Sequence, residues 1–172
     1  RRRVRPSRER TDVLDLSPAL LVTADGDHRH APHQVLRLER LVEGLAKLSD
    51  AVDLTLTTNG ALLANKAKDL RDAGLKRVTV SLDSLDETIF RQMAGREASP
   101  QRVLEGIRAA EEAGLRPIKI NCVAVRGLND DTLVDIARRF RGTGHVVRFI
   151  EFMDVGTLNE WREEQVVPAA EI

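Results

Sequence analysis

Polar and charged side chains recur at the carboxyl ends of the strands that the sequence predicts. Thr57 ends the first clear strand, Ser81 and Asp83 end the second, Lys119 lies on the third and Met153 follows the fourth. In parallel β/α architectures these strand ends and the loops after them form the ligand site. Ser, Thr and Asn at strand ends most often make turns and helix caps, so each position alone carries little weight.

Lys119 is harder to explain as ordinary packing. A strand of a parallel sheet is normally covered on both faces, and an unpaired ammonium there is costly. Two interpretations stay open. The ammonium pairs with a carboxylate such as Glu151 from the neighbouring strand, or it meets an anionic ligand as a point charge.

Arg148 and Glu151 are three residues apart, so a regular strand places them on opposite faces. Both would face one ligand only if a bulge intervened, and we expect a surface Arg148 and an inward Glu151. Met153 fits ordinary core packing, as most methionines do.

The elements that must position these residues alternate between helix and strand from residue 35 onward. Apolar periodicity and β-branched runs predict helices at 35–48, 61–73, 86–92, 101–113 and 131–140, and strands at 52–58, 77–82, 118–122 and 146–152, with a further candidate strand at 20–23. This order predicts an α/β fold with parallel strands joined by right-handed crossover helices. A closed eight-fold barrel takes about 250 residues, so the chain supplies a partial (β/α) barrel or a small open sheet.

Composition divides the chain at about residue 34. Residues 1–34 hold six arginines within the first ten positions, three of the four histidines and no long periodic segment. We expect 1–34 to be a basic, irregular and poorly ordered N-terminal segment and 35–172 to be the β/α barrel domain. The histidines at 28–33 lack nearby cysteines or acids at ligand spacing, and Pro32 interrupts them, which favours a loop over a metal site.

Charge and hydropathy exclude several classes of partner. The formal net charge is zero, and no apolar run approaches the roughly 20 residues that span a bilayer. We therefore expect no nucleic-acid or membrane partner and a cytoplasmic location. The single cysteine, Cys122, rules out a disulfide within the chain and any metal or cluster site that needs several of its thiolates.

Four motifs at these strand ends occur in an order that resembles one enzyme family. They are Leu-Thr-Thr-Asn-Gly at 56–60, Val-Ser-Leu-Asp-Ser-Leu-Asp at 80–86, Lys-Ile-Asn at 119–121 and Arg-Phe-Ile-Glu-Phe-Met-Asp-Val-Gly at 148–156, followed by Asn159 and Trp161. The chain resembles the GTP 3′,8-cyclases of the radical S-adenosylmethionine superfamily from about residue 36 to its last residue.

The resemblance implies an incomplete (β/α)6 TIM-like barrel that binds S-adenosylmethionine beside a [4Fe–4S] cluster. Such an enzyme is a lyase that cyclises GTP to 3′,8-cyclo-7,8-dihydro-GTP in molybdopterin, and hence molybdenum cofactor, biosynthesis. Matched by motif, Thr57 and Lys119 would contact GTP, and Ser81 and Met153 would line the S-adenosylmethionine pocket. Lys119 would then meet the triphosphate. The resemblance assigns no catalytic or metal-ligating residue to this chain.

The chain departs from the family at the cluster. The family's Cys-x-x-x-Cys-x-x-Cys loop is absent, Cys122 stands alone in mid-strand, and other residues replace the Gly-Gly-Glu-Pro strand end at 30–34. We therefore expect the activity to be incomplete in this chain and the chain to be inactive by itself. The alternative is a non-catalytic nucleotide-binding or interaction module derived from the family. A homodimer is a further option, because an unclosed sheet exposes strand edges.

Overall fold

The computed structural model describes residues 38–48, 53–154 and 161–172. The predicted N-terminal segment 1–34 lies outside the described residues, together with the candidate strand at 20–23 and the histidines at 28–33. Asn159 and the last two residues of the fourth motif also lie outside them.

Helices and strands alternate as the periodicity predicts. In chain order they are α1 (Leu38–Ala46), β1 (Thr55–Thr58), α2 (Leu63–Asp72), β2 (Arg77–Ser81), α3 (Glu87–Ala94), α4 (Pro100–Glu112), β3 (Lys119–Ala124), η1 (Asp130–Thr132), α5 (Leu133–Phe140), β4 (Val146–Glu151) and η2 (Glu163–Gln165). The helix predicted at 131–140 is split into the 3-10 turn η1 and α5. Of the helices in the described ranges, none combines the length and apolarity that crossing a membrane requires.

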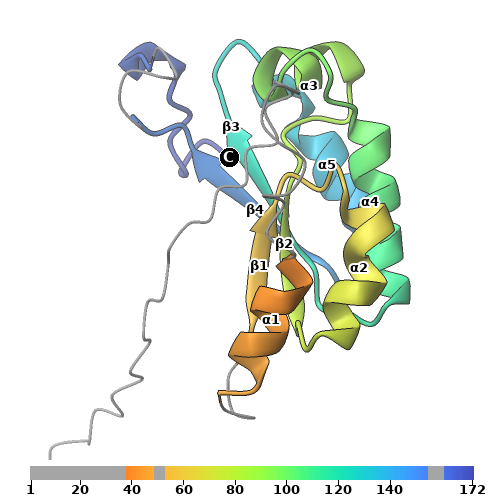
Figure 1. Ribbon diagram of the computed structural model, residues 1–172. Coiled ribbons are helices and arrows are strands. Elements are labelled where there is room, and N and C mark those ends of the chain that lie inside the picture. Colours follow the sequence, from red (N-terminus) through yellow and green to blue (C-terminus); the bar gives the residue numbers. More distant parts are fainter. Residues whose placement is uncertain (1–37, 49–52, 155–160) are drawn as a thin grey trace, which may run out of the picture.

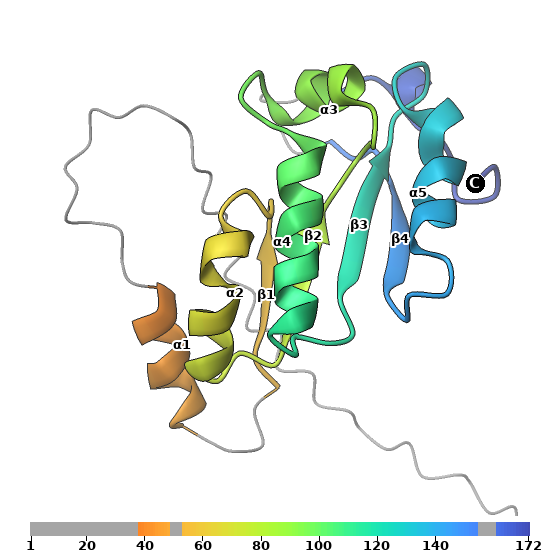
Figure 2. The same ribbon diagram turned by 90° about the vertical axis from the view of Figure 1, so that its right-hand side faces the viewer.

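The strands form one parallel sheet in the order β1-β2-β3-β4. Helices α2, α4 and α5 lie together on one side of this sheet (Figure 1), and the view from that side shows them in front of the strands (Figure 2). The helix α1 lies beside α2 at the β1 end of the sheet, where Lys66 and Glu39 form an ion pair of 2.7 Å. The described residues therefore form the predicted partial barrel.

The two faces of the sheet differ in character. On the face toward the helices, fully buried apolar side chains form the core, among them Val78 and Val80 of β2 and Ile120 and Cys122 of β3. No described helix lies over the opposite face (Figure 1), and side chains such as Thr57 are exposed there. We call this second side of the sheet the open face.

The turn after β1 packs directly on α4 through two glycines. Gly60 has a φ of +76°, a conformation that residues with a Cβ rarely adopt, and a Cβ there would lie 3.0 Å from side-chain carbons of Val80 and Val103. Gly106 of α4 faces the same turn, and a Cβ on it would lie 2.9 Å from the Gly60 carbonyl oxygen and 3.0 Å from Leu63 Cβ. The close approach of α4 to the β1–α2 turn therefore depends on the missing side chain at Gly106.

Gly106→Ala is expected to lower the free energy of unfolding by about 1–3 kcal/mol, because a methyl group would be forced against backbone that has no room to move. Gly44→Ala is the matched control, since Gly44 is also helical and nothing lies within 4 Å of a Cβ built there. That control should gain up to about 1 kcal/mol from the better helix propensity of alanine. Urea unfolding midpoints measure both changes, and equal midpoints would show that the α4 contact is not tight.

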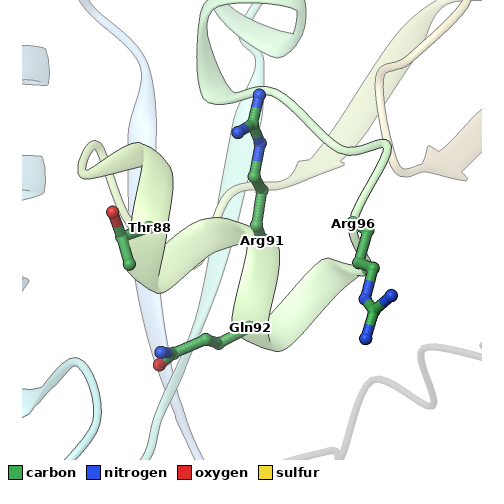
Figure 3. A pocket seen from close by; sticks show the side chains of 5 residues that line it. Thr88, Arg91, Gln92 and Arg96 are labelled. Atoms are coloured by element: carbon green, nitrogen blue, oxygen red, sulfur yellow. The ribbon is translucent and has the colours of Figure 1, made fainter.

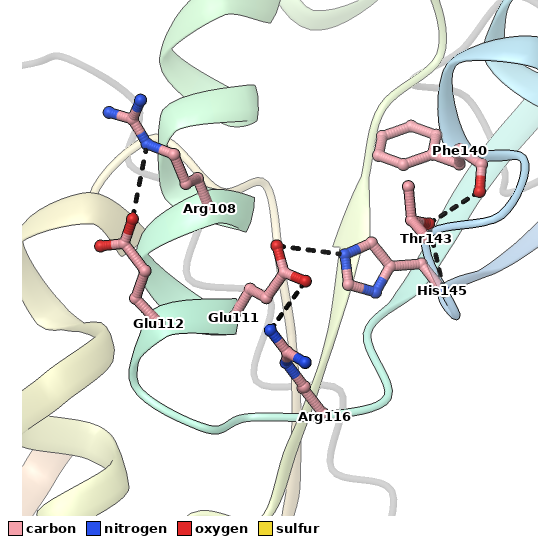
Figure 4. Close-up of polar contacts among 7 residues, drawn as sticks. All are labelled: Arg108, Glu111, Glu112, Arg116, Phe140, Thr143 and His145. Carbon is pink, nitrogen blue, oxygen red and sulfur yellow. Dashed lines mark hydrogen bonds and ion pairs between the residues drawn. The ribbon is translucent and has the colours of Figure 1, made fainter.

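A second polar cluster lies at the amino ends of β3 and β4, away from the strand ends that carry the motifs (Figure 4). The side chain of His145 is only 4 % exposed and lies between the Phe140 ring and Glu111, whose Oε2 is 3.9 Å from His145 Nε2. Arg116 pairs with the other oxygen of Glu111 at 2.9 Å. Burial lowers the pKa of His145 most and Arg116 lowers it further, whereas Glu111 raises it.

The stability of the protein is expected to fall as the pH is lowered from about 6.5 toward 5. The folded-state pKa of His145 is below its unfolded value, so the unfolded chain binds more protons in this range and acid favours unfolding. His145→Gln removes this titration and should flatten the dependence. Urea unfolding of the parent chain and of His145→Gln between pH 5 and pH 8 measures this pH dependence. If the free energy of unfolding of both proteins changes equally with pH, the role of His145 is contradicted.

Candidate functional site

The open face carries polar and charged side chains in two adjacent rows. The row nearer the amino ends runs Thr57, Thr79, Lys119 and Val146, and the next row runs Ser81, Asn121 and Arg148. Residues paired in register on parallel strands point to the same face, so the register brings these side chains together. Thr57 and Lys119 are two strands apart in one row, which separates their backbones by about 10 Å.

Thr57 is exposed on the open face, whereas its two successors form the turn. Thr58 Oγ1 accepts a hydrogen bond from Gly60 N at 3.1 Å, and Asn59 Oδ1 accepts one from Ala61 N at 3.1 Å. The turn is therefore closed by Thr58 and Asn59. No hydrogen bond within the described residues engages the Thr57 side chain, which leaves its hydroxyl group for a ligand.

Lys119 is half-buried in the same row, and no carboxylate of the described residues forms an ion pair with it. The pairing with Glu151, one of the two interpretations left open, does not occur. Glu151 pairs in register with Ala124, so its side chain lies on the face opposite to Lys119, and its Oε1 accepts a hydrogen bond from Ala169 N at 2.7 Å. Of the two interpretations, the one that remains is an anionic ligand.

Arg148 is the residue of this face that sequence reasoning missed. It lies opposite Glu151 and is exposed, as expected, but the expectation of an inward Glu151 is wrong, because Glu151 is exposed as well and it is Arg148 that shares the open face with Lys119. Its Nε and Nη2 donate to Asn121 Oδ1 at 3.0 and 2.8 Å. Asn121 thus orients the guanidinium without neutralising it. Two cations on one face favour a phosphate-bearing ligand.

Arg77, at the amino end of β2 on the same face, differs from Lys119 and Arg148 in having a carboxylate partner among the described residues. Arg77 is paired with Asp53, so its charge is already balanced. Within the described part of the open face, the unbalanced positive charge is therefore concentrated at Lys119, the first residue of β3, and at Arg148, the third residue of β4.

Ser81 and Met153 occupy different parts of the site. Ser81 is half-buried on β2 in register with Asn121, while Ser84 Oγ accepts a hydrogen bond from Asp86 N at 3.1 Å in the turn that follows. Met153 comes two residues after the end of β4 and is 60 % exposed, so the interpretation as core packing is wrong. The register places Thr57, Ser81 and Lys119 on one face, and Met153 follows β4 at the same edge.

Asp83, the other polar residue at the end of β2, is mostly buried. Its Oδ1 accepts a hydrogen bond from Val123 N at 2.8 Å, and its carbonyl oxygen accepts one from Asn129 Nδ2 at 2.7 Å. Burial raises the pKa of the Asp83 carboxyl, while the hydrogen bond from Val123 acts in the opposite direction. The sequence indicates only a turn at Asn129 and does not predict its hydrogen bond to Asp83.

A further concave region lies elsewhere, on the outside of α3. It has a volume of about 500 Å³ and is lined by Thr88, Arg91, Gln92, Gly95 and Arg96. Figure 3 shows that Arg91, Gln92 and Arg96 point in different directions instead of converging. Arg91 is also held by Glu87 at 2.5 Å. A ligand would find no common focus of polar groups there, so the open face remains the better candidate.

The family model of the radical SAM superfamily matches residues 21–140 of this sequence. The chain belongs to the radical SAM superfamily. The match begins inside the segment 1–34 that composition sets apart.

Three of the curated relatives that resemble this chain carry the same name. The chain is 54 % identical over 132 residues to a GTP 3′,8-cyclase of Xanthomonas campestris pv. campestris, covering 77 % of this chain and 39 % of that protein. It is 55 % identical over 135 residues to the GTP 3′,8-cyclase of Acidothermus cellulolyticus, covering 78 % and 37 %, and 42 % identical to that of Aquifex aeolicus, covering 78 % and 42 %. The resemblance inferred from the four motifs is confirmed. The chain spans about two fifths of the length of these relatives.

A solved structure shows the same fold. The radical SAM enzyme coproporphyrinogen III oxidase (HemN) from Escherichia coli matches with a TM-score of 0.54 at 11 % identity, over 78 % of this chain and 33 % of that one. At this identity the likeness concerns the fold alone. Together with the four parallel strands, it confirms the predicted partial radical SAM barrel.

The radical SAM superfamily implies S-adenosylmethionine and a [4Fe–4S] cluster as cofactors. The described residues do not fit the cluster. Cys122 is fully buried, its Sγ donates to Asp83 O at 3.5 Å, and burial raises its pKa to about 12, so it is a protonated thiol at neutral pH. No group of three His, Cys, Asp or Glu side chains that could hold a metal ion occurs within the described ranges.

Proposed function

We propose that this chain forms the GTP-binding part of a GTP 3′,8-cyclase, which cyclises GTP to 3′,8-cyclo-7,8-dihydro-GTP in molybdenum cofactor biosynthesis. The observation that carries the proposal is the placement of Lys119 and Arg148 on neighbouring strands of the open face, which also carries Thr57. Relatives at 42 to 55 % identity that are named GTP 3′,8-cyclases support the choice of GTP among phosphate-bearing ligands.

The two cations would bind the triphosphate in different ways. Lys119 offers a compact ammonium that attracts phosphate oxygens as a point charge. Arg148 offers a planar fork, of which Asn121 already engages Nε and Nη2 and leaves Nη1 to the ligand. Since the two residues lie on neighbouring strands in adjacent rows, one triphosphate can meet both. The part of the site that sets affinity would then be the β3–β4 half of the open face.

The hydroxyl groups would orient the two ligands. Thr57 lies two strands from Lys119 in the same row, so a nucleotide whose phosphates meet Lys119 can reach Thr57 with its nucleoside. Ser81 on β2 would hydrogen-bond S-adenosylmethionine, and Met153 would pack against it from the edge beyond β4. Holding two reactants at one edge in fixed geometry is the contribution that such a surface makes to a reaction.

The radical chemistry itself belongs to S-adenosylmethionine and its cluster, for which the described residues offer no thiolate ligands. The part of this chain is to bind and orient GTP. We therefore propose that GTP binding can be measured on the chain whether or not turnover can.

Thr57→Val is expected to weaken GTP binding about five- to tenfold, because it removes one hydroxyl hydrogen bond while keeping the shape of the side chain. Thr55→Val is the matched control, since Thr55 lies on the same strand and the same face, one step further from the carboxyl edge. Titration calorimetry with GTP measures both variants against the parent chain. Absence of GTP binding by the parent, or equal losses in both variants, would contradict the proposed function.

A further inference from the structure

Strand β2 leaves β3 before β3 ends. Leu82 N donates to Asn121 O at 2.9 Å just after the last paired residues of the two strands. The next donor along β3, Val123 N, instead meets the side chain of Asp83, whose Oδ1 accepts its hydrogen bond at 2.8 Å. The carboxyl group thus replaces the backbone acceptor that β2 no longer supplies, and the Val123 N–H remains satisfied.

Asn129 completes this junction from the loop after β3. Its Nδ2 donates to Asp83 O at 2.7 Å and to Val123 O at 2.8 Å, and its Oδ1 accepts from Val125 N at 2.8 Å. Asn129 is fully buried and Asp83 is mostly buried, so these hydrogen bonds act in a low dielectric. The ends of β2 and β3 are therefore held together by side chains and not by sheet pairing.

We propose that Asp83 is a positioning residue of the ligand site. Its carboxyl fixes the point at which β2 diverges from β3, and it thereby holds the last paired row of the open face, in which Ser81 lies beside Asn121 and Asn121 orients Arg148. The inference rests on the proposed function, because that function assigns Arg148 to GTP and Ser81 to S-adenosylmethionine. It adds a residue that touches neither ligand and acts through the strands that carry both contacts.

The effect of Asp83 is confined to the carboxyl edge. The middle of β2 and β3 is held by the backbone ladder and by the fully buried side chains of Val80 and Ile120. Loss of the Asp83 carboxyl leaves Val123 N without an acceptor, so the strands separate there while the centre of the sheet stays paired. A residue with a purely structural role would lower the protection of the whole sheet equally.

Residue-resolved amide hydrogen exchange and GTP affinity test this in the full chain. Asp83→Ala removes the acceptor, Asp83→Asn retains an oxygen for Val123 N, and Ile136→Val in the buried core of α5 controls for a general loss of stability. We expect Asp83→Ala to accelerate exchange of the Val123 amide at least about tenfold more than that of Val80, and to weaken GTP binding about tenfold. Asp83→Asn should stay within about threefold of the parent chain in both measurements.

Two results would overturn the inference. One is uniform acceleration across the sheet in Asp83→Ala, as expected for Ile136→Val, and the other is unchanged GTP affinity despite a fast-exchanging Val123 amide. If Asp83→Ala does not fold, Asp83→Glu replaces it, because the longer side chain displaces the carboxyl by one methylene. The results expected for Asp83→Ala are then expected for Asp83→Glu. If the parent chain does not bind GTP, the proposed function fails, and the amide exchange pattern alone tests the role of Asp83. Acceleration confined to the carboxyl edge supports the positioning role. Uniform acceleration overturns it.

Discussion

Lys119→Ala is expected to weaken GTP binding by about 10- to 150-fold, because a hydrogen bond to a charged group contributes about 1.5–3 kcal/mol. The ammonium lies half-buried on the open face, and no described carboxylate balances it. The affinity of the parent chain should therefore fall with ionic strength more steeply than that of the variant, since the variant has lost one of its two unbalanced cations.

Lys68→Ala provides the control for net charge. Lys68 lies on the exposed side of α2, where it pairs with Asp72 at 2.7 Å, and its loss changes the charge of the chain by the same amount. Titration with GTP at two ionic strengths compares both variants with the parent. Equal affinities for Lys119→Ala and Lys68→Ala would show that the open face does not bind the triphosphate, and the proposed function would have to be abandoned.

The order of the elements could be predicted because it depends on local patterns. Apolar spacing located α2 and α4, and alternation of apolar and polar residues located β1 and β3, with errors only at the ends. The strand-end rule then directed attention to the carboxyl edge of the sheet. Thr57 and Ser81 lie near that edge, whereas Lys119 is the first residue of β3, and the register places all three on one face.

The face of each side chain could not be predicted in the same way. A spacing of three places Arg148 and Glu151 on opposite sides of β4, but only the arrangement of helices decides which side is covered. The wrong expectation of an inward Glu151 and its excluded pairing with Lys119 have this common cause. Once β4 is paired in register with β3, Arg148 falls beside Asn121 and both are resolved.

Asn129 was missed for a different reason. Near Gly127 and Asp130 it has the local appearance of a turn residue, and turns are indeed formed there. Its decisive contact is with Asp83, 46 residues earlier in the chain. Side-chain hydrogen bonds between distant segments leave no periodic signal in a sequence, so only the folded structure reveals them.

Asn129→Ala is expected to lower the free energy of unfolding by about 2–4 kcal/mol, because it leaves buried polar groups without partners. Val125 N loses its acceptor, and the carbonyl oxygens of Asp83 and Val123 lose their strongest donor. A fully buried side chain with three such bonds cannot be replaced by water unless the junction opens. Urea unfolding measures the loss, with Asn65→Ala on the exposed side of α2 as a control that should change by less than about 0.5 kcal/mol.

Asn129→Asp separates the two functions of this side chain. The carboxylate keeps an oxygen for Val125 N, but it cannot donate to Asp83 O or Val123 O and brings a negative charge against both carbonyls. We therefore expect Asn129→Asp to be at least as destabilising as Asn129→Ala at neutral pH, and less so in acid, where the protonated carboxyl regains one donor. A neutral effect of Asn129→Asp would show that the two donated bonds contribute little, and that the ends of β2 and β3 are held by the Asp83 carboxyl alone.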